Sequence, residues 1–181
     1  MVGVLGAVSN ADTVLLFSPT PADLYDLDHH KAYRWGFDVE LPGQEEVVSA
    51  TLTIRNIRNW DSNPNVLYIR LLDWCELGVR QSTDNQGGGD FFATYGYPHI
   101  HLVTYVNLPT TPQNLVYEFA AGQIVALNSY LADGRIGLGL DPDCHFYNDG
   151  VELRLVTPEP AVWILLLGTL PMLLRRRSRW S

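Results

Sequence analysis

Oxygen-bearing side chains gather in the stretch GLGLDPDCHFYNDG near the end of the chain. Asp141, Asp143, Asn148 and Asp149 place four oxygen donors within nine residues, and a proline and a glycine favour turns around them. Hard cations such as Ca²⁺ bind carboxylate and carbonyl oxygens of this kind. The spacing is not that of an EF-hand, because no glycine occupies the sixth position counted from Asp141. We expect instead a calcium site of the type that joins loops of a β-sandwich.

A second acidic group, within ADLYDLDHHKAYRWGF, precedes the first clear strand. The first and last strands of a jelly roll lie near each other, so Asp26 or Asp28 can meet Asp141 and Asp143. Carboxylates so placed repel one another unless a cation lies between them. Turn and cap chemistry, in which Asp and Asn dominate, and a catalytic use of the loop are the open alternatives. The predicted calcium ligands are Asp141, Asp143, Asn148, Asp149, Asp26 and Asp28.

The histidines are the other potential metal ligands. His99 and His101 stand two apart in a predicted strand, where they share one face and could chelate Zn²⁺ or Fe²⁺. We favour a partly exposed strand edge, because no acidic residue follows within the strand. His29, His30 and His145 are interpreted as loop histidines. The sequence contains no nucleophile elbow, HExxH, phosphate-binding loop or CxxC motif, so it nominates no catalytic residue.

Length and charge limit the class of protein. The chain has 181 residues and 46% hydrophobic content, which suits one domain with appendages and a real core. Up to residue 157 it carries 8 basic and 19 acidic residues. A body this acidic repels nucleic acid and anionic lipid. We therefore expect no nucleic-acid partner and a surplus of carboxylates for cations.

Alternation of apolar and polar residues predicts strands over most of 12–157. The clearest run extends from Tyr33 to Leu41, with one buried face. Turn signals such as LPGQEE and YNDG separate the runs. The pattern predicts one all-β domain, a β-sandwich or jelly roll of about eight strands. The segment QIVALNSYLADG predicts one short helix that ends at Gly134. The other runs cover 50–55, 67–71, 100–106, 115–119, 136–140 and 151–155.

The two cysteines, Cys75 and Cys144, lie far apart in the sequence beside loop-like segments. The sequence allows two interpretations: one long-range disulfide, if the compartment is oxidising, or two buried free thiols. The first residues allow two interpretations as well. Residues 1–11 resemble the end of a signal peptide, with small residues before Asp12, although a basic n-region is missing. A first strand from Val2 to Val8 is the alternative.

The C-terminal stretch VTPEPAVWILLLGTLPMLLRRRSRWS predicts a membrane-directed hydrophobic helix. A helix from Ala161 to Leu174 reaches about 21 Å, which is short against a hydrocarbon core of about 30 Å. The arginines that follow would stay on the cytoplasmic side, which places residues 1–157 on the other side. An amphipathic helix of the domain is the alternative, but Val162 to Leu167 is apolar on every face.

The order of these features resembles the PEP-CTERM sorting signal of Gram-negative bacteria, over about 20 residues. The matching residues are Pro158, Glu159 and Pro160, then the apolar segment, then Arg175, Arg176 and Arg177. The resemblance implies Sec-dependent export and an inner-membrane intermediate. An exosortase would then cleave within 158–181, and the protein would pass to the cell surface or extracellular matrix. The apolar segment is shorter than the family pattern and contains Pro171.

The body of the chain loosely resembles β-sandwich ectodomains that precede such signals, including galactose-binding-like modules with a structural calcium. We therefore expect an exported, non-enzymatic β-sandwich with a structural or adhesive role, whose partners are the inner membrane and an exosortase. Extracellular polysaccharide is a further candidate partner, because Trp60, Tyr95 and Tyr97 stand in loop positions where aromatic rings could stack on sugars. The favoured interpretation of these rings is that they pack at the ends of the sandwich. The alternative is a carbohydrate-active hydrolase or glycan-binding module on the same fold.

Overall fold

The computed structural model describes residues 12–41, 45–84 and 88–158, which form ten strands and one α-helix within these ranges. Short 3-10 segments are η1 (Leu24–Asp26), η3 (Phe91–Thr94) and η4 (Leu131–Asp133). The main elements are β1 (Thr13–Phe17), β2 (Lys31–Asp38), β3 (Ser49–Asn59), β4 (Val66–Leu72), β5 (Gly78–Thr83), β6 (His99–Val106), β7 (Gln113–Glu118), α1 (Ala121–Tyr130), β8 (Arg135–Pro142), β9 (Phe146–Tyr147) and β10 (Gly150–Thr157).

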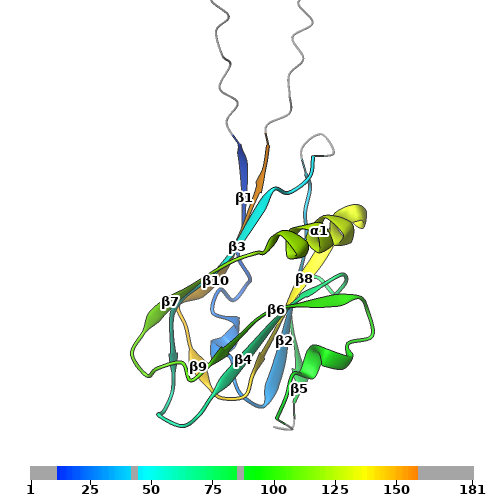
Figure 1. Cartoon of the computed structure of the whole chain (residues 1–181). Helices are drawn as coiled ribbons and strands as arrows, with labels where there is room; N and C mark the ends of the chain where they lie inside the picture. The colour runs from blue at the N-terminus through cyan, green and yellow to red at the C-terminus, as the bar shows by residue number, and fades with distance from the viewer. Residues whose placement is uncertain (1–11, 42–44, 85–87, 159–181) are drawn as a thin grey trace, which may run out of the picture.

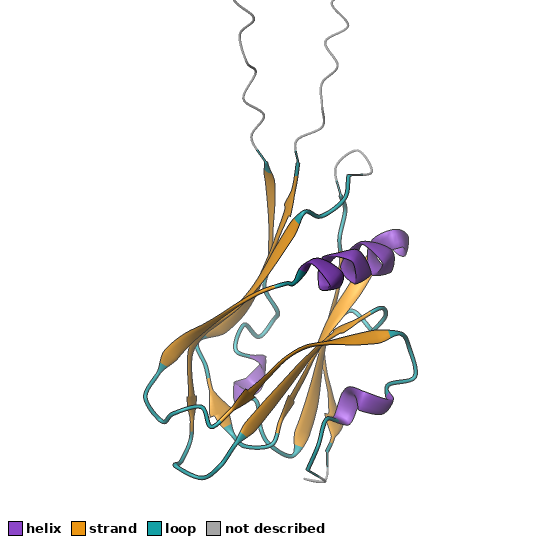
Figure 2. Cartoon of the chain, in the orientation of Figure 1, coloured by secondary structure: helices purple, strands orange, loops and turns teal. Residues whose placement is uncertain are grey.

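The strands form two five-stranded antiparallel sheets (Figure 1). The first sheet has the order β1-β10-β3-β7, and β9 pairs with β3 beyond the end of β10. The second has the order β5-β2-β8-β4-β6. Because the chain alternates between the sheets in this order, the arrangement is that of a jelly roll with β5 added at one edge. Figure 2 shows how little helix accompanies the strands. The predicted all-β class is confirmed, with ten strands rather than about eight.

The main hydrophobic core lies between the two sheets. Alternate residues of β3 and β10, such as Leu52 and Leu153, face alternate residues of β4 and β8, such as Ile69 and Leu138. Aromatic rings also connect the sheets, since the rings of Phe17 and Phe37 lie 5.0 Å apart. Burial of so many large apolar side chains is the main stabilising contribution to the fold.

The predicted helix is confirmed as α1. It continues into η4, and Gly134 ends it with a φ of +80°, a conformation that glycine adopts without a Cβ clash. Asn128 holds the helix to the sandwich, because its side chain accepts from Val47 N and donates to Val47 O. Figure 1 shows α1 at the end of the sandwich where β1 begins and β10 ends.

The outer face of the second sheet carries a small second core, which the sequence pattern does not predict. Ala32, Leu72, Cys75 and Phe92 are fully buried there. The glycines of β8 make room for it: a Cβ on Gly139 would lie 2.9 Å from the ring of Phe92. The expectation of a single buried face for the run from Tyr33 is therefore wrong, because Leu72, Cys75 and Phe92 cover the other face of β2 and β8.

Candidate metal site

Asp141 lies at the end of β8 on the face that the second core covers. Residues two apart in a strand share a face, so Asp141 continues the row that begins with Gly137 and Gly139. Its side chain is 0% exposed. Oδ2 accepts a hydrogen bond of 2.7 Å from Phe91 N, whereas Oδ1 has no hydrogen-bond partner. An unpaired carboxylate oxygen in such a place is costly, and a cation is the usual remedy.

Two further carboxylates lie beside Asp141. Carboxylate oxygens of Asp84, Asp141 and Asp143, here named the carboxylate cluster, all lie within 4.8 Å of one another. Asp143 also has a buried Oδ1 without a hydrogen-bond partner. The backbone fixes both positions, since Asp143 N donates to Val66 O at 2.9 Å and Asp84 N donates to His30 O at 2.9 Å. Asp84 and Asp143 are only partly buried, so a cation can reach Asp141 from their side.

Burial and neighbouring carboxylates disfavour the ionised forms of Asp141 and Asp143. Burial is the main reason that the pKa of Asp141 is raised to about 7. The Phe91 N–H opposes this shift, and the carboxylates of Asp84, Asp143 and Asp90 add to it. Burial and the carboxylates of Asp84 and Asp90 also raise the pKa of Asp143, while a backbone hydrogen bond from Gly89 opposes the shift. The nearby guanidinium of Arg70 is engaged elsewhere, because its Nε lies 2.6 Å from Asp90 Oδ2.

Three converging carboxylates, one of them with an unpaired buried oxygen, fit a hard dication such as Ca²⁺. Backbone carbonyls and water would complete six to eight ligands. The same burial argues against catalysis, because the side chain of Asp141 cannot touch a substrate outside the protein. The sequence prediction did not include Asp84. Its one local signal is the turn stretch TDNQGGGD directly after β5, and only the sheet order brings it to β8.

The remaining predicted calcium ligands lie elsewhere, in hydrogen bonds that hold loops. Asn148 donates from its backbone to Asp26 Oδ1 at 3.3 Å and from its side chain to Asp23 O at 2.7 Å. Asp149 Oδ2 accepts from Asn56 Nδ2 at 2.6 Å, at the bulge of β3. The hydrogen bonds of Asp26, Asn148 and Asp149 are therefore those of turn and cap residues, which was the alternative to a calcium site. The two acidic stretches do lie near each other, since Phe146 N donates to Leu27 O at 3.2 Å, but neither Asp26 nor Asp28 joins Asp141 and Asp143 in the carboxylate cluster as expected.

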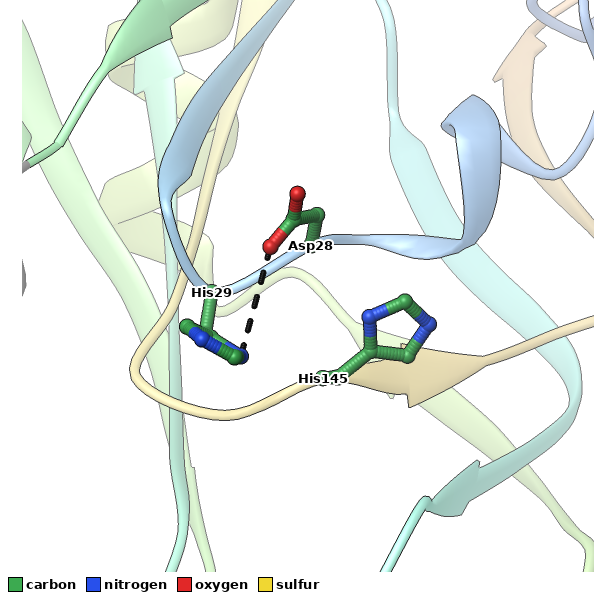
Figure 3. Close-up of side chains that lie close together, drawn as sticks. All are labelled: Asp28, His29 and His145. Atoms are coloured by element: carbon green, nitrogen blue, oxygen red, sulfur yellow. Dashed lines mark ion pairs between the residues drawn. The ribbon is translucent and has the colours of Figure 1, made fainter.

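Asp28, the sixth predicted ligand, faces two histidines rather than Asp141. Its Oδ1 accepts from His30 N at 3.0 Å and lies 4.0 Å from His29 Nδ1. Figure 3 shows Asp28, His29 and His145 together, from the segment before β2 and the loop after β8. The histidines at 29 and 145, interpreted from the sequence as loop residues, thus belong to a mixed cluster. His99 and His101 bond instead to Tyr97 O and to Thr104 Oγ1.

The two cysteines are free and buried in different places. Cys75 belongs to the second core on the outer face, and Cys144 to the main core between the sheets. Of the two alternatives left open by the sequence, the structure has the free thiols and not the disulfide. Burial raises the pKa of the Cys75 thiol to about 11, which suppresses its reactive thiolate form.

The predicted tail lies almost wholly outside the described residues. Pro158 is the last residue described and is exposed. Glu159, Pro160, the hydrophobic segment and Arg175, Arg176 and Arg177 lie beyond it, as residues 1–11 lie before the described part. Among the helices of the described ranges, none has the length and hydropathy needed to cross a bilayer.

Comparison with known proteins adds little. No family model matches the sequence, and no curated protein matches it. Among solved structures, the chain is similar to one described as latent aurone synthase (polyphenol oxidase) from natural source, with a TM-score of 0.38 and 9% sequence identity. The match covers 70% of this chain and 24% of that one. This chain thus spans about a quarter of that protein's length, and a likeness this distant carries no argument about function.

Proposed function

We propose that this chain is a non-enzymatic β-sandwich protein stabilised by a divalent cation, with Ca²⁺ bound by Asp84, Asp141 and Asp143. The observation that carries the proposal is the fully buried Asp141, whose Oδ1 has no partner beside two further carboxylates. The cation would neutralise the cluster and fasten three segments to one another: the end of β5, the end of β8, and the start of η3 through Phe91 N. Its role is structural.

We further propose that the protein is exported and that its C-terminal segment is a PEP-CTERM signal read by an exosortase at the inner membrane. The support is the order of features in 158–181, namely Pro-Glu-Pro, apolar segment and arginines. Export also suits the cation, because millimolar extracellular calcium saturates sites of modest affinity. The mature protein would then have a structural or adhesive role at the cell surface or in the matrix.

Calorimetric titration with Ca²⁺ tests the cation part. The wild type should bind one Ca²⁺ with an affinity of millimolar or tighter. Asp84→Asn and Asp143→Asn should each weaken binding by tenfold or more, since each removes one ligand charge. Asp133→Asn is the matched control, because Asp133 is an exposed carboxylate outside the cluster that accepts a hydrogen bond from Arg135 N. Equal binding by all four proteins would exclude the carboxylate cluster as the site.

Mass spectrometry of the surface form in a Gram-negative host that carries an exosortase tests the export part. Cleavage close to Pro158–Pro160 is expected. A surface form that retains Ser181 would show that the chain is not processed as a sorting substrate, and a protein retained in the cytoplasm would exclude export itself.

A glycan-binding role is a second candidate, favoured by one surface feature. Trp60 is 55% exposed at the end of β3, and the adjoining residues Asp61 and Asn63 help to line a cavity of about 360 Å³ with Asn107. An exposed aromatic ring beside amides and a carboxylate suits a sugar. Retention on a polysaccharide matrix that is lost in Trp60→Ala would support this role, and equal retention would remove it.

A further inference from the structure

Three side chains from two distant parts of the sequence converge beside the start of β2. They are Asp28, His29 and His145, here named the His/Asp cluster (Figure 3). One ligand atom of each lies within 4.8 Å of those of the other two, and all three residues are partly buried. We propose that the His/Asp cluster binds a transition-metal dication, with Zn²⁺ as its occupant. The proposal is independent of the cation at the carboxylate cluster.

The ligand types select the metal. Two imidazole nitrogens and one carboxylate oxygen suit Zn²⁺, whereas Ca²⁺ and Mg²⁺ prefer oxygen ligands alone. Three protein ligands leave a fourth tetrahedral position for water. All three ligand residues are partly exposed, so solvent can supply the water ligand.

The ring of His29 is held in a way that suits a metal ligand. Its Nε2 lies 3.0 Å from Nε2 of His30, and its Nδ1 lies 4.0 Å from Asp28 Oδ1. In the tautomer with the proton on Nε2, His29 would donate to His30 and bind the metal through Nδ1. Metal-binding histidines commonly use the second nitrogen in this way. Two atoms bound to one tetrahedral Zn²⁺ lie about 3.3 Å apart, so the ligands need to move by less than about 1 Å.

His145 brings the third ligand from the loop between β8 and β9. Its backbone oxygen accepts from Trp60 N at 3.1 Å, and its ring lies against that of Tyr147 with centroids 4.9 Å apart. Nε2 is buried and has no hydrogen-bond partner. Figure 3 shows the other ring nitrogen on the side of Asp28. Aromatic neighbours thus fix the imidazole, while nothing among the described residues bonds to the ring itself.

The backbone presents Asp28 to this histidine without help from a metal. Leu24, Tyr25, Asp26 and Leu27 all have positive φ, so the chain makes a left-handed turn just before Asp28. Leu24 and Leu27 are fully buried and hold this strained turn in place. Leu27 O accepts from Phe146 N at 3.2 Å, which joins the segment of Asp28 to that of His145. Asp28 N also donates to the buried Tyr33 hydroxyl at 2.7 Å.

Titration of the full chain with Zn²⁺, followed by calorimetry, tests the proposal. The wild type should bind one Zn²⁺, and Co²⁺ at the same site should give the visible absorption of a tetrahedral complex. His145→Gln should weaken Zn²⁺ binding by at least about tenfold and abolish the Co²⁺ band, because it removes a direct ligand. His29→Gln should do the same. As its side chain lies in a partly exposed loop, this second variant covers the case in which His145→Gln does not fold.

Two controls make the outcome decisive. The double variant His99→Gln/His101→Gln removes the only other closely spaced histidine pair besides 29 and 30, and it should leave Zn²⁺ binding unchanged. Asp141→Asn, which alters the carboxylate cluster, should also leave Zn²⁺ binding unchanged. Unaltered Zn²⁺ affinity in both His145→Gln and His29→Gln would overturn the proposal, as would loss of binding in either control. Failure here would leave the Ca²⁺ titration of the carboxylate cluster unaffected.

Discussion

The carboxylate cluster and the His/Asp cluster draw on neighbouring stretches of chain but offer opposite kinds of ligand. Asp143 belongs to the first and His145 to the second, two residues apart, and the backbone of His30 bonds to that of Asp84. The first cluster contains oxygen donors alone and includes a fully buried member. The second contains nitrogen and oxygen donors, all partly buried.

The difference follows from what covers each stretch. The second core, with Phe92 at its centre, closes over the outer face of β8 and removes Asp141 from water. Asp28 is only partly buried and is positioned by a left-handed turn and by Tyr33 instead. A buried carboxylate gains most from a cation, because no water screens its charge. The two clusters should therefore differ in how strongly each affects folding stability, with the carboxylate cluster dominant.

Removing the ring of Phe92, which covers Asp141, should have the largest effect on folding stability. Phe92→Ala deletes a fully buried ring and should lower the free energy of unfolding by about 3–5 kcal/mol. It should also admit water to Asp141 and lower that residue's pKa toward the ordinary value, while Zn²⁺ binding at the His/Asp cluster stays the same. Denaturant unfolding with and without each metal measures these effects. The exposed helix residue Val125, changed to alanine, is the control. A lower Zn²⁺ affinity in Phe92→Ala would show that the His/Asp cluster also depends on the packing of the second core.

The pH dependence of stability should be the next largest effect. The pKa of Asp141 is raised in the folded state to about 7, so between about pH 4 and pH 7 the folded protein holds a proton that the unfolded chain has lost. In chelator, the free energy of unfolding should therefore fall as pH rises through this window, by about 2–4 kcal/mol. Asp141→Asn should remove this part of the dependence. Urea melts at several pH values in both proteins provide the measurement, and parallel curves would contradict the assignment.

The smallest effects should come from the acidic residues that hold loops. Asp149→Asn alters one exposed hydrogen bond to Asn56 and should change stability by less than about 1 kcal/mol. Asp26→Asn should behave alike, because an amide oxygen can still accept from Asn148 N. Neither should alter the response to Ca²⁺ or Zn²⁺, which thermal melts in each metal would check. If either variant lost its stabilisation by Ca²⁺, the substituted residue would have to be a calcium ligand after all.

The contrast between the clusters also shows where sequence reasoning succeeds. Period-2 patterns predict the central strands because one face of each packs in the main core, and the spacing of Asp141 and Asp143 predicts convergent carboxylates. The strand β5 gives no such signal, because GVRQST is mostly exposed at the sheet edge. Asp84 follows β5, 57 positions before Asp141, and only the order of strands in space joins them.

The second core and the His/Asp cluster could not be predicted from the sequence either, because both depend on how distant segments pack together. The alternation in GRIGLGL predicts a strand with one apolar face, but it does not reveal that the glycines of its other face make room for Cys75 and Phe92. The histidines at 29 and 145 carry no periodic pattern, and a left-handed turn of non-glycine residues cannot be expected from LYDL. Tertiary packing decides both features.

The most direct test of the central claim compares the wild type with Asp141→Asn in a Ca²⁺ titration followed by melting temperature. Without Ca²⁺ at neutral pH, the variant should melt higher than the wild type, because it removes a buried negative charge and keeps an oxygen for Phe91 N. With millimolar Ca²⁺ the wild type should gain stability and the variant should not, so that the gap closes or reverses. A wild type that melts at the same temperature with and without Ca²⁺ would contradict the account.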